Sequence, residues 1–205
     1  PSLFARNRKG MAINLAFEKL SLWQKVAFGA GLLERMLPNY QIFSDTAGFG
    51  ETKVLRNQLD LIWQWLDKSS SCKINYDAQL TKLEPQIPDP EEFDTFGVFP
   101  ALDVCMALMS LLQGMQDKSG EGLNNVARLS ENSVSYYVEL LLAQEDETQQ
   151  VSADKIAEHP LMQWECATQH EVFDFLLTSP ENKASCKKIK SLVLEEGMSN
   201  LGIEI

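Results

Sequence analysis

The run VFPALDVCMALMSLL, residues 98–112, decides the fold class, because it is the most apolar stretch of the 205-residue chain. It is too short to span a bilayer and contains Pro100 and Asp103, so we expect a buried helix rather than a membrane span. Pro100 suits the first position of a helix, where its missing N–H costs nothing. A helix that is apolar on all sides lies inside a fold, so we expect the other helices to surround this one.

Helical periodicity recurs on both sides of this run. Apolar residues spaced three and four apart predict long helices over residues 15–37, 51–68, 123–144 and 160–178, and a last helix ending near residue 196. Asn75 is a good N-cap for a short helix, and Ser152 can cap a short turn. No stretch alternates convincingly as a strand. The prediction is an all-α, single-domain bundle of seven or eight helices around a central apolar helix.

Three features set the expected boundaries. Pro38 should end the first long helix, because the residue before a proline avoids the helical conformation. Gly120 and Gly122 should lie in a loop. The basic start of the chain is expected to form a loose N-terminal tail over residues 1–11, with residues 12–205 as the helical domain.

The charge and the cysteines restrict the class of protein. A net charge of -11, from 29 acidic and 18 basic residues, argues against binding to nucleic acid or to anionic membranes. The four cysteines form no C-x-x-C pair and no disulfide framework, and no signal peptide is visible. We therefore expect a cytoplasmic protein that binds a neutral or basic partner, and self-association is compatible with the sequence.

The residues that would bind metals or perform catalysis are sparse. The two histidines, His159 and His170, lack the spacing of a metal site, so we predict no metal and no cofactor. Cys166 and His170 are four apart on one helix, but no third group is visible and the thiol is expected to be inert. His159, just before Pro160, is expected to be a cap or loop residue.

Asp103 is the acidic residue with the most unusual position, since it lies in the most apolar helix. A buried carboxylate there could be catalytic or could hold a ligand. The structural alternative is that Asp103 meets the positive end of its helix, or an arginine such as Arg35 or Arg56.

Two aromatic-rich segments, residues 38–50 and 85–100, are long for connections inside a compact domain. We expect loops that lie side by side and form the functional surface. The candidate binding residues at this surface and around Asp103 are Arg35, Asn39, Tyr40, Asp45, Asp94 and Asp103. The alternative is that the two segments only close opposite ends of the bundle.

Several motifs resemble those of the YjaG-type bacterial proteins, the family of domain of unknown function 416. The motifs are ERMLPNY at residues 34–40, GFG at 48–50, LDLIW at 59–63, GVFPALD at 97–103 and SNLGI at 199–203. The similarity extends over nearly the whole chain from about residue 20 and is looser between about residues 119 and 182. The resemblance implies a cytosolic helical bacterial protein, and it supplies no reaction.

Two functional hypotheses follow. The first is a non-catalytic binding or regulatory module that recognises a protein partner, because catalytic motifs are missing and the aromatic segments are long. The second is an enzyme or small-ligand-binding protein with a polar site around Asp103, Arg35, Asn39 and Tyr40. A deep polar pocket would favour the second hypothesis, and a flat exposed apolar patch the first.

Overall fold

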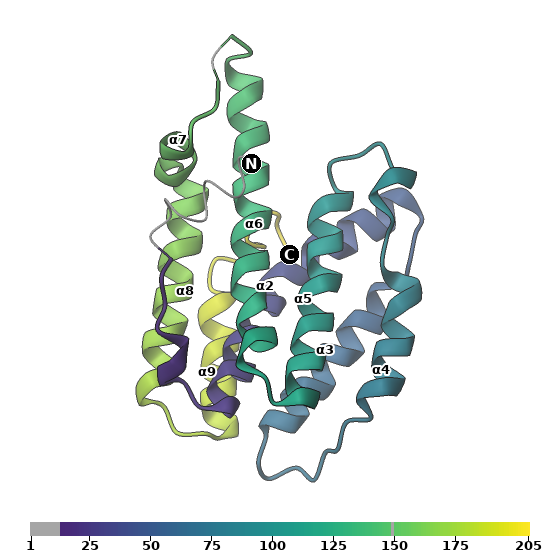
Figure 1. The fold of residues 1–205 in the computed structure, drawn as a ribbon, viewed down its shortest axis with the longest axis vertical. Coiled ribbons are helices and arrows are strands. Elements are labelled where there is room, and N and C mark those ends of the chain that lie inside the picture. Colours follow the sequence, from purple (N-terminus) through teal and green to yellow (C-terminus); the bar gives the residue numbers. More distant parts are fainter. Residues whose placement is uncertain (1–12, 149) are drawn as a thin grey trace.

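The computed structural model describes residues 13–148 and 150–205, and within them the chain forms eight α-helices and no extended sheet (Figure 1). The α-helices are α2 (Leu22–Ala47), α3 (Thr52–Leu66), α4 (Tyr76–Leu83), α5 (Val98–Asp117), α6 (Gly120–Glu145), α7 (Ala153–Glu158), α8 (Pro160–Thr178) and α9 (Lys183–Val193). Three short 3-10 helices are η1 (Phe17–Lys19), η2 (Glu84–Gln86) and η3 (Pro90–Glu92). The predicted all-α single domain is confirmed. The predicted tail over residues 1–11 lies outside the described residues.

The apolar helix α5 is buried as predicted, and it packs against α2, α4 and α6. It begins at Val98, so Pro100 occupies its first turn and the helix extends to Asp117. At this length α5 would suffice to cross a membrane, but 61% of its most apolar segment is buried inside the bundle. The core helix of a globular protein passes the same test of length and composition.

The largest difference from the predicted helix boundaries concerns α2, which continues through Pro38 to Ala47. A proline inside a helix removes one backbone hydrogen bond and costs about 3 kcal/mol. Here α2 contacts α3, α5, α6, α8 and α9, and most of its residues are buried. Burial against five helices outweighs the local cost, so the segment expected as a loop over residues 38–50 is helical up to its Gly48 C-cap.

The turn between α5 and α6 is shorter than predicted, because Gly120 and Gly122 belong to α6. The reason is the close approach of the two helices. A Cβ atom on Gly122 would lie 3.2 Å from the Cα of Gly114 and from the carbonyl oxygen of Ser110. The glycines therefore allow α5 and α6 to pack as an antiparallel pair (Figure 1).

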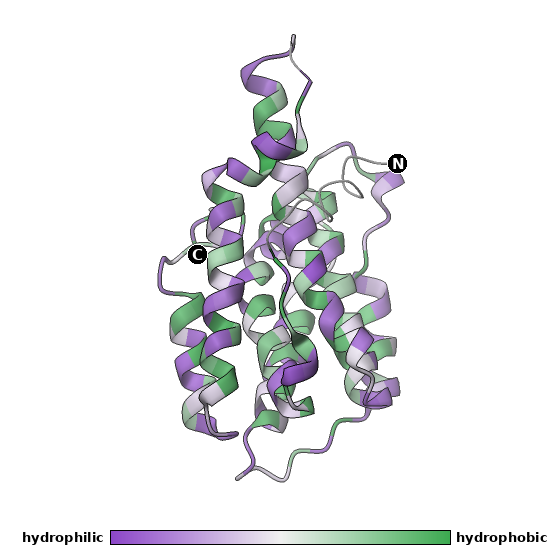
Figure 2. Ribbon diagram, turned by 60° about the vertical axis from the view of Figure 1, so that its left-hand side comes forward, coloured by the Kyte–Doolittle hydropathy of each residue, from purple (hydrophilic) through white to green (hydrophobic). Residues whose placement is uncertain are grey.

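Two separate hydrophobic clusters hold the bundle together. The larger one joins α2, α3, α4, α5, α6, α8 and α9, and the smaller one consists of Val134, Val138, Ile156, Met162 and Leu201. Both α6 and α8 cross from one cluster to the other. Figure 2 shows that each outer helix carries hydrophobic residues on part of its circumference and hydrophilic residues on the rest. The smaller cluster is completed by the C-terminal segment, which folds back through an isolated bridge between Met198 and Glu204.

Candidate functional site

The six residues predicted to bind a ligand do not form one site. Arg35 and Asn39 lie in a buried polar network, Tyr40 lies in a contact between two segments, and Asp103 lines a pocket elsewhere. Asp45 and Asp94 are exposed side chains outside all three places. Each location is therefore described separately.

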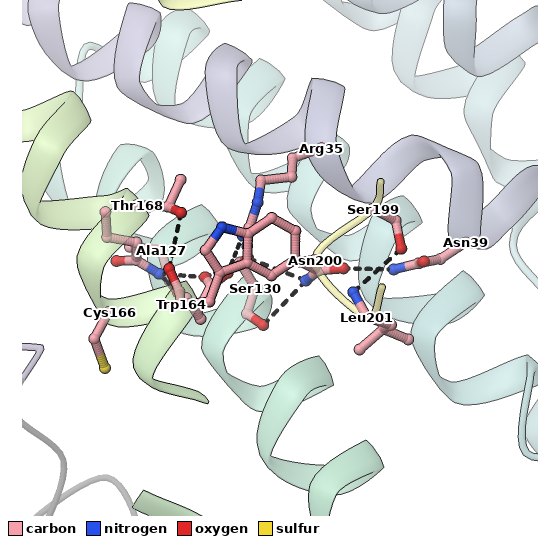
Figure 3. A network of polar contacts seen from close by, with 12 residues as sticks. Arg35, Asn39, Ala127, Ser130, Trp164, Cys166, Thr168, Ser199, Asn200 and Leu201 are labelled. Atoms are coloured by element: carbon pink, nitrogen blue, oxygen red, sulfur yellow. Dashed lines mark hydrogen bonds and ion pairs between the residues drawn. The ribbon is translucent and has the colours of Figure 1, made fainter. Parts of the chain in front are cut away.

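The buried network is centred on an ion pair between Arg35 of α2 and Glu165 of α8, both of which are 0% exposed (Figure 3). The second carboxylate oxygen of Glu165 accepts hydrogen bonds from Ser130 Oγ at 2.6 Å and from Gln169 Nε2 at 2.7 Å. The Arg35 guanidinium also lies 4.1 Å from the centre of the Trp164 ring. These contacts offset part of the desolvation cost of the two charges, although Arg35 Nε and Nη2 are buried and have no hydrogen-bond partner among the described residues.

The network continues into the C-terminal segment through Asn200. The side-chain amide of Asn200 donates to Ser130 Oγ at 3.2 Å, and its oxygen accepts from Asn39 Nδ2 at 2.7 Å (Figure 3). The backbone N–H of Asn200 donates to the carbonyl oxygen of Arg35 at 3.2 Å, one turn before Pro38. These bonds fix the C-terminal segment to α2 and α6.

The position of the network explains its structural role. Along α6, Ser130 lies between Ala127 of the larger hydrophobic cluster and Val134 of the smaller one. Along α8, Glu165 lies between Met162 and Val172 of the same two clusters. The network therefore separates the two clusters and fixes how the helices meet, and neither Arg35 nor Glu165 lines any of the pockets described below.

The predicted contact between residues 38–50 and 85–100 is confirmed. The Tyr40 hydroxyl donates to the carbonyl oxygen of Gln86 at 2.7 Å. The Phe93 ring packs at 5.1 Å from Phe43 and at 5.5 Å from Phe49. The alternative that these segments close opposite ends of the bundle is excluded by these distances.

Tyr40 and Asn39 are not surface residues, contrary to the expected rim. Both are buried, and burial raises the pKa of the Tyr40 phenol well above its ordinary value. The loop that follows depends on glycine geometry, because Gly50 has a φ of 71° and a Cβ atom there would lie 2.1 Å from the Tyr40 hydroxyl. The segment contact is a packed part of the fold, and of the binding residues predicted in these two segments Asp45 and Asp94 are the ones that reach solvent.

A pocket of about 270 Å³ lies between the start of α5 and the middle of α6. We call it the α5–α6 pocket, and its lining residues are Phe96, Phe99, Pro100, Asp103, Asn132, Ser133 and Tyr136. The Phe96 and Tyr136 rings are stacked, with centres 5.1 Å apart and planes 11° apart. The Phe99 ring lies 5.2 Å from Tyr136 and is 39% exposed. Three aromatic rings and one carboxylate thus line the same pocket.

Asp103 is partly buried, and its carboxylate accepts a hydrogen bond from Ser133 Oγ at 2.6 Å. Burial raises the pKa of Asp103 from 3.8 to about 6, while the Ser133 hydrogen bond acts in the opposite direction. The expected pairing with Arg35 or Arg56 is wrong, because Arg35 pairs with Glu165 and Arg56 with Glu34 and Asp60. Within residues 13–148 and 150–205, no basic side chain forms an ion pair with Asp103.

Two other hollows are larger but more polar. One, of about 540 Å³, lies beside α6 and is lined by Lys25, Glu121 and Arg128 among others. Another, of about 420 Å³, lies between α3 and α9, where Lys183, Lys187 and Lys190 face Asp60 and Asp67. Both carry acidic and basic side chains together, whereas the α5–α6 pocket carries one acidic group and no basic one.

Cys166, His170 and His159 belong to α8 or to its N-cap and make local contacts there. His170 Nδ1 donates to the backbone carbonyl of Cys166 at 2.8 Å, so the ring is engaged by the backbone rather than by the thiol. Burial, as the largest cause, raises the pKa of Cys166 to about 11. His159 caps α8 by accepting from the Leu161 N–H at 3.1 Å, as predicted. In the described parts of the chain, no three His, Cys, Asp or Glu side chains gather as a metal site would require.

Sequence reasoning missed most partners of these residues. Glu165 gave no signal as the partner of Arg35, because it lies 130 positions away on a helix with ordinary periodicity. Ser130 gave none as a donor to Glu165, which lies 35 positions further along the chain. Tyr136 could have been noted, since Tyr136-Tyr137 is an aromatic pair on an otherwise amphipathic helix. Only the antiparallel packing of α5 and α6 shows that Tyr136 faces Phe99.

The comparisons with known proteins agree with the resemblance of the motifs. The family model described as "Protein of unknown function (DUF416)" matches residues 12–204. The chain is 37% identical to the uncharacterized protein YjaG of Escherichia coli over 192 residues, which cover 93% of this chain and 95% of that protein. It is 36% identical to an uncharacterized protein of Haemophilus influenzae over 195 residues, which cover 94% and 96% of the two chains.

A solved structure supports the same assignment. The crystal structure of a DUF416 family protein from Shewanella baltica has a TM-score of 0.83 and 33% identity to this chain. The alignment covers 94% of this chain and 100% of that one. The chain therefore belongs to the DUF416 family of bacterial proteins, a family defined by its sequence and its helical fold and not by a known reaction.

Proposed function

We propose that this protein is a non-catalytic binding module and that the α5–α6 pocket is its binding site. The observation that carries the proposal is Asp103, a partly buried carboxylate with a raised pKa and no basic partner from the described chain, inside an aromatic pocket. A perturbed titratable group in a cavity is the usual sign of a functional site. A carboxylate left in this state weakens the fold, which is a common cost of binding sites.

The size of the pocket favours a small group over a whole ligand of drug size. Pockets for such ligands usually measure about 300–1,000 Å³. The α5–α6 pocket, at about 270 Å³, matches one projecting side chain or one small molecule. A side chain projecting from a protein partner, in a cytoplasmic setting, fits the first of the two functional hypotheses.

Binding is favoured over catalysis by the shortage of reactive groups around Asp103. A pKa of about 6 would suit a general acid or base. However, the lining residues include no cysteine, histidine or lysine that could act as a nucleophile or as a second proton carrier. Asp103 and Tyr136 are the titratable side chains that line the pocket.

The test compares two substitutions at equally exposed apolar residues. Phe99 on α5 and Leu177 on α8 are both 39% exposed, and only Phe99 lines the pocket. In a screen of small molecules and short peptides, followed by backbone amide NMR, ligands should shift resonances of residues 96–103 and 132–136. Phe99→Ala should remove these shifts, and Leu177→Ala should preserve them.

The opposite result would overturn the proposal. If ligands of this protein shift resonances elsewhere in the bundle, or bind Phe99→Ala as tightly as the unchanged protein, the α5–α6 pocket is not the binding site. Circular dichroism of both variants is the control for folding.

A further inference from the structure

The inference concerns the chemistry of the group that the α5–α6 pocket accepts, and it rests on the proposed function of that pocket as a binding site. Two carboxylates in this protein have the same serine contact and different charge environments. Ser130 donates to Glu165, which also pairs with Arg35, whereas Ser133 donates to Asp103, which has no cation. The charge of Asp103 is therefore balanced by no described side chain of this protein.

The rings around Asp103 add a second attraction for positive charge. The face of an aromatic ring carries negative potential, and a cation held near it gains about 0.5–2 kcal/mol depending on its desolvation. Phe96, Phe99 and Tyr136 lie within 6.5 Å of one another, measured between ring centres, beside the carboxylate. An acidic protein with a net charge of -11 also attracts cations before contact.

The polar groups of the pocket decide which kind of cation fits. A guanidinium has five N–H donors and needs several acceptors, whereas an alkylated ammonium has few or none. Apart from Asp103, the lining side chains that carry oxygen or nitrogen are Asn132, Ser133 and Tyr136, and the Ser133 hydroxyl already donates to Asp103. A pocket lined by aromatic rings and one carboxylate therefore suits an ammonium group that carries alkyl substituents.

We propose that the α5–α6 pocket binds an alkylated ammonium group, with its charge beside the Asp103 carboxylate and its alkyl substituents against Phe99 and Tyr136. The group can belong to a free small amine or to a modified lysine side chain on a protein partner. Both sources present the same chemistry to the pocket, and the experiment below separates them.

The first arm tests the charge. Choline is compared with the neutral alcohol that has a tert-butyl group in place of the trimethylammonium group, by NMR titration at about pH 8, well above the pKa of Asp103 near 6. Choline should bind at least roughly tenfold more tightly, since a contact with an unscreened charge contributes at this level. Asp103→Asn should reduce the preference to about twofold or less.

The second arm uses pH. Choline keeps its charge at every pH, so a change in its affinity reports on the protein. Asp103 is faced by Asn132 and Ser133 from α6, and Tyr136 is the other titratable side chain that lines the pocket. Lowering the pH from about 8 to about 5 should weaken choline binding roughly tenfold, because Asp103 becomes protonated below about 6. Asp103→Asn should show no such pH dependence.

The third arm separates the sources. A short peptide with a central trimethyllysine should bind more tightly than choline if the cation belongs to a protein partner. If choline binds more tightly than the peptide, a protein partner is not the source of the cation.

The outcomes distinguish this inference from the proposed function. If the neutral alcohol binds at the pocket as tightly as choline, the cation inference fails and the binding site stands. If neither compound nor the peptide shifts resonances of residues 96–103 and 132–136, the cation inference fails. The comparison of Phe99→Ala with Leu177→Ala then tests the binding site independently of the cation inference.

Discussion

Two serines on α6, three positions apart, donate hydrogen bonds to carboxylates on different neighbouring helices. Ser130 donates to Glu165 of α8 at 2.6 Å, and Ser133 donates to Asp103 of α5 at 2.6 Å. Glu165 is fully buried and paired with Arg35, whereas Asp103 is partly exposed in a pocket and has no basic partner from the described chain. The same local contact therefore serves a closed network in one place and an open site in the other.

The difference between Glu165 and Asp103 shows how a charge with a structural role can be distinguished from a charge in a functional site. A buried charge that has its counterion inside the same chain is compatible with a role in fixing the packing of helices. A charge that is desolvated without a counterion lowers the stability of the fold, and such a group is maintained where it contacts something outside the chain. The following experiments test this contrast at both places.

The largest expected effect is at the closed network. Glu165→Ala removes the counterion of Arg35 and leaves a buried guanidinium unpaired, which should lower the free energy of unfolding by about 3–5 kcal/mol. Chemical denaturation measures this loss. Glu171→Ala, at an exposed position of the same helix α8, should change stability by less than about 0.5 kcal/mol. A similarly small effect of Glu165→Ala would contradict a structural role for the network.

The next effect, of opposite sign, is at the pocket. Burial raises the pKa of Asp103 to about 6, so the folded protein binds this proton more tightly than the unfolded chain does. The resulting stabilisation is complete below the unfolded pKa of about 3.9 and is lost as the pH rises through 6. Asp103→Asn should therefore raise stability by about 1–2 kcal/mol at neutral to alkaline pH, after a discount for partial exposure, and should give no gain near pH 4.

Thermal unfolding at both pH values checks this prediction. A substitution that destabilises the protein equally at both values would show that the Asp103 carboxylate stabilises the fold through a contact other than its charge. A gain near pH 4 would also contradict the assigned direction of the pKa shift.

The smallest effect is a difference between two matched substitutions. Ser130→Ala removes a donor to a fully buried carboxylate and also a contact with Asn200. Ser133→Ala removes a donor to a carboxylate that water can reach in part. We expect Ser130→Ala to lower the free energy of unfolding by about 1 kcal/mol more than Ser133→Ala, because hydrogen bonds to buried charges contribute more.

The two serine substitutions can also be compared by their effect on the pKa of Asp103. Because the Ser133 hydrogen bond lowers the pKa of Asp103, Ser133→Ala should raise that pKa further. NMR titration of the carboxyl carbon of Asp103 measures it, with Ser130→Ala as the control that should leave it unchanged. An unchanged pKa in Ser133→Ala would remove the basis for comparing the two serines.

Much of the fold followed from local patterns. The apolar run 98–112 predicted the buried helix α5. Asn75 was predicted as an N-cap, and it accepts from the Ala78 N–H at 3.1 Å. His159 was expected to be a cap or loop residue, and it caps α8. These are local effects, since periodicity and capping depend on residues within a few positions of one another. The local rule failed at Pro38, where burial of α2 against five helices outweighs the preference for a helix end.

The candidate site was only partly predictable. Asp103 was identified because a carboxylate in an apolar helix is unusual, and that reasoning needs the sequence alone. Its pairing with an arginine was a wrong prediction, because a sequence does not show which of several helices brings its side chain within reach. Arg35 and Asn39 were singled out as neighbours of Asp103, and they lie instead in the closed network with Glu165 and Asn200.

By itself the sequence determined the helical class, the buried position of α5, the acidic surface and the family, since these depend on composition, periodicity and motifs. The tertiary structure alone decided that Arg35 meets Glu165 and that Asp103 meets Ser133 in a pocket lined by three aromatic rings. The physical reason is that periodicity specifies which face of a helix is buried, whereas the partner of a buried charge depends on how helices distant in the chain are placed against one another.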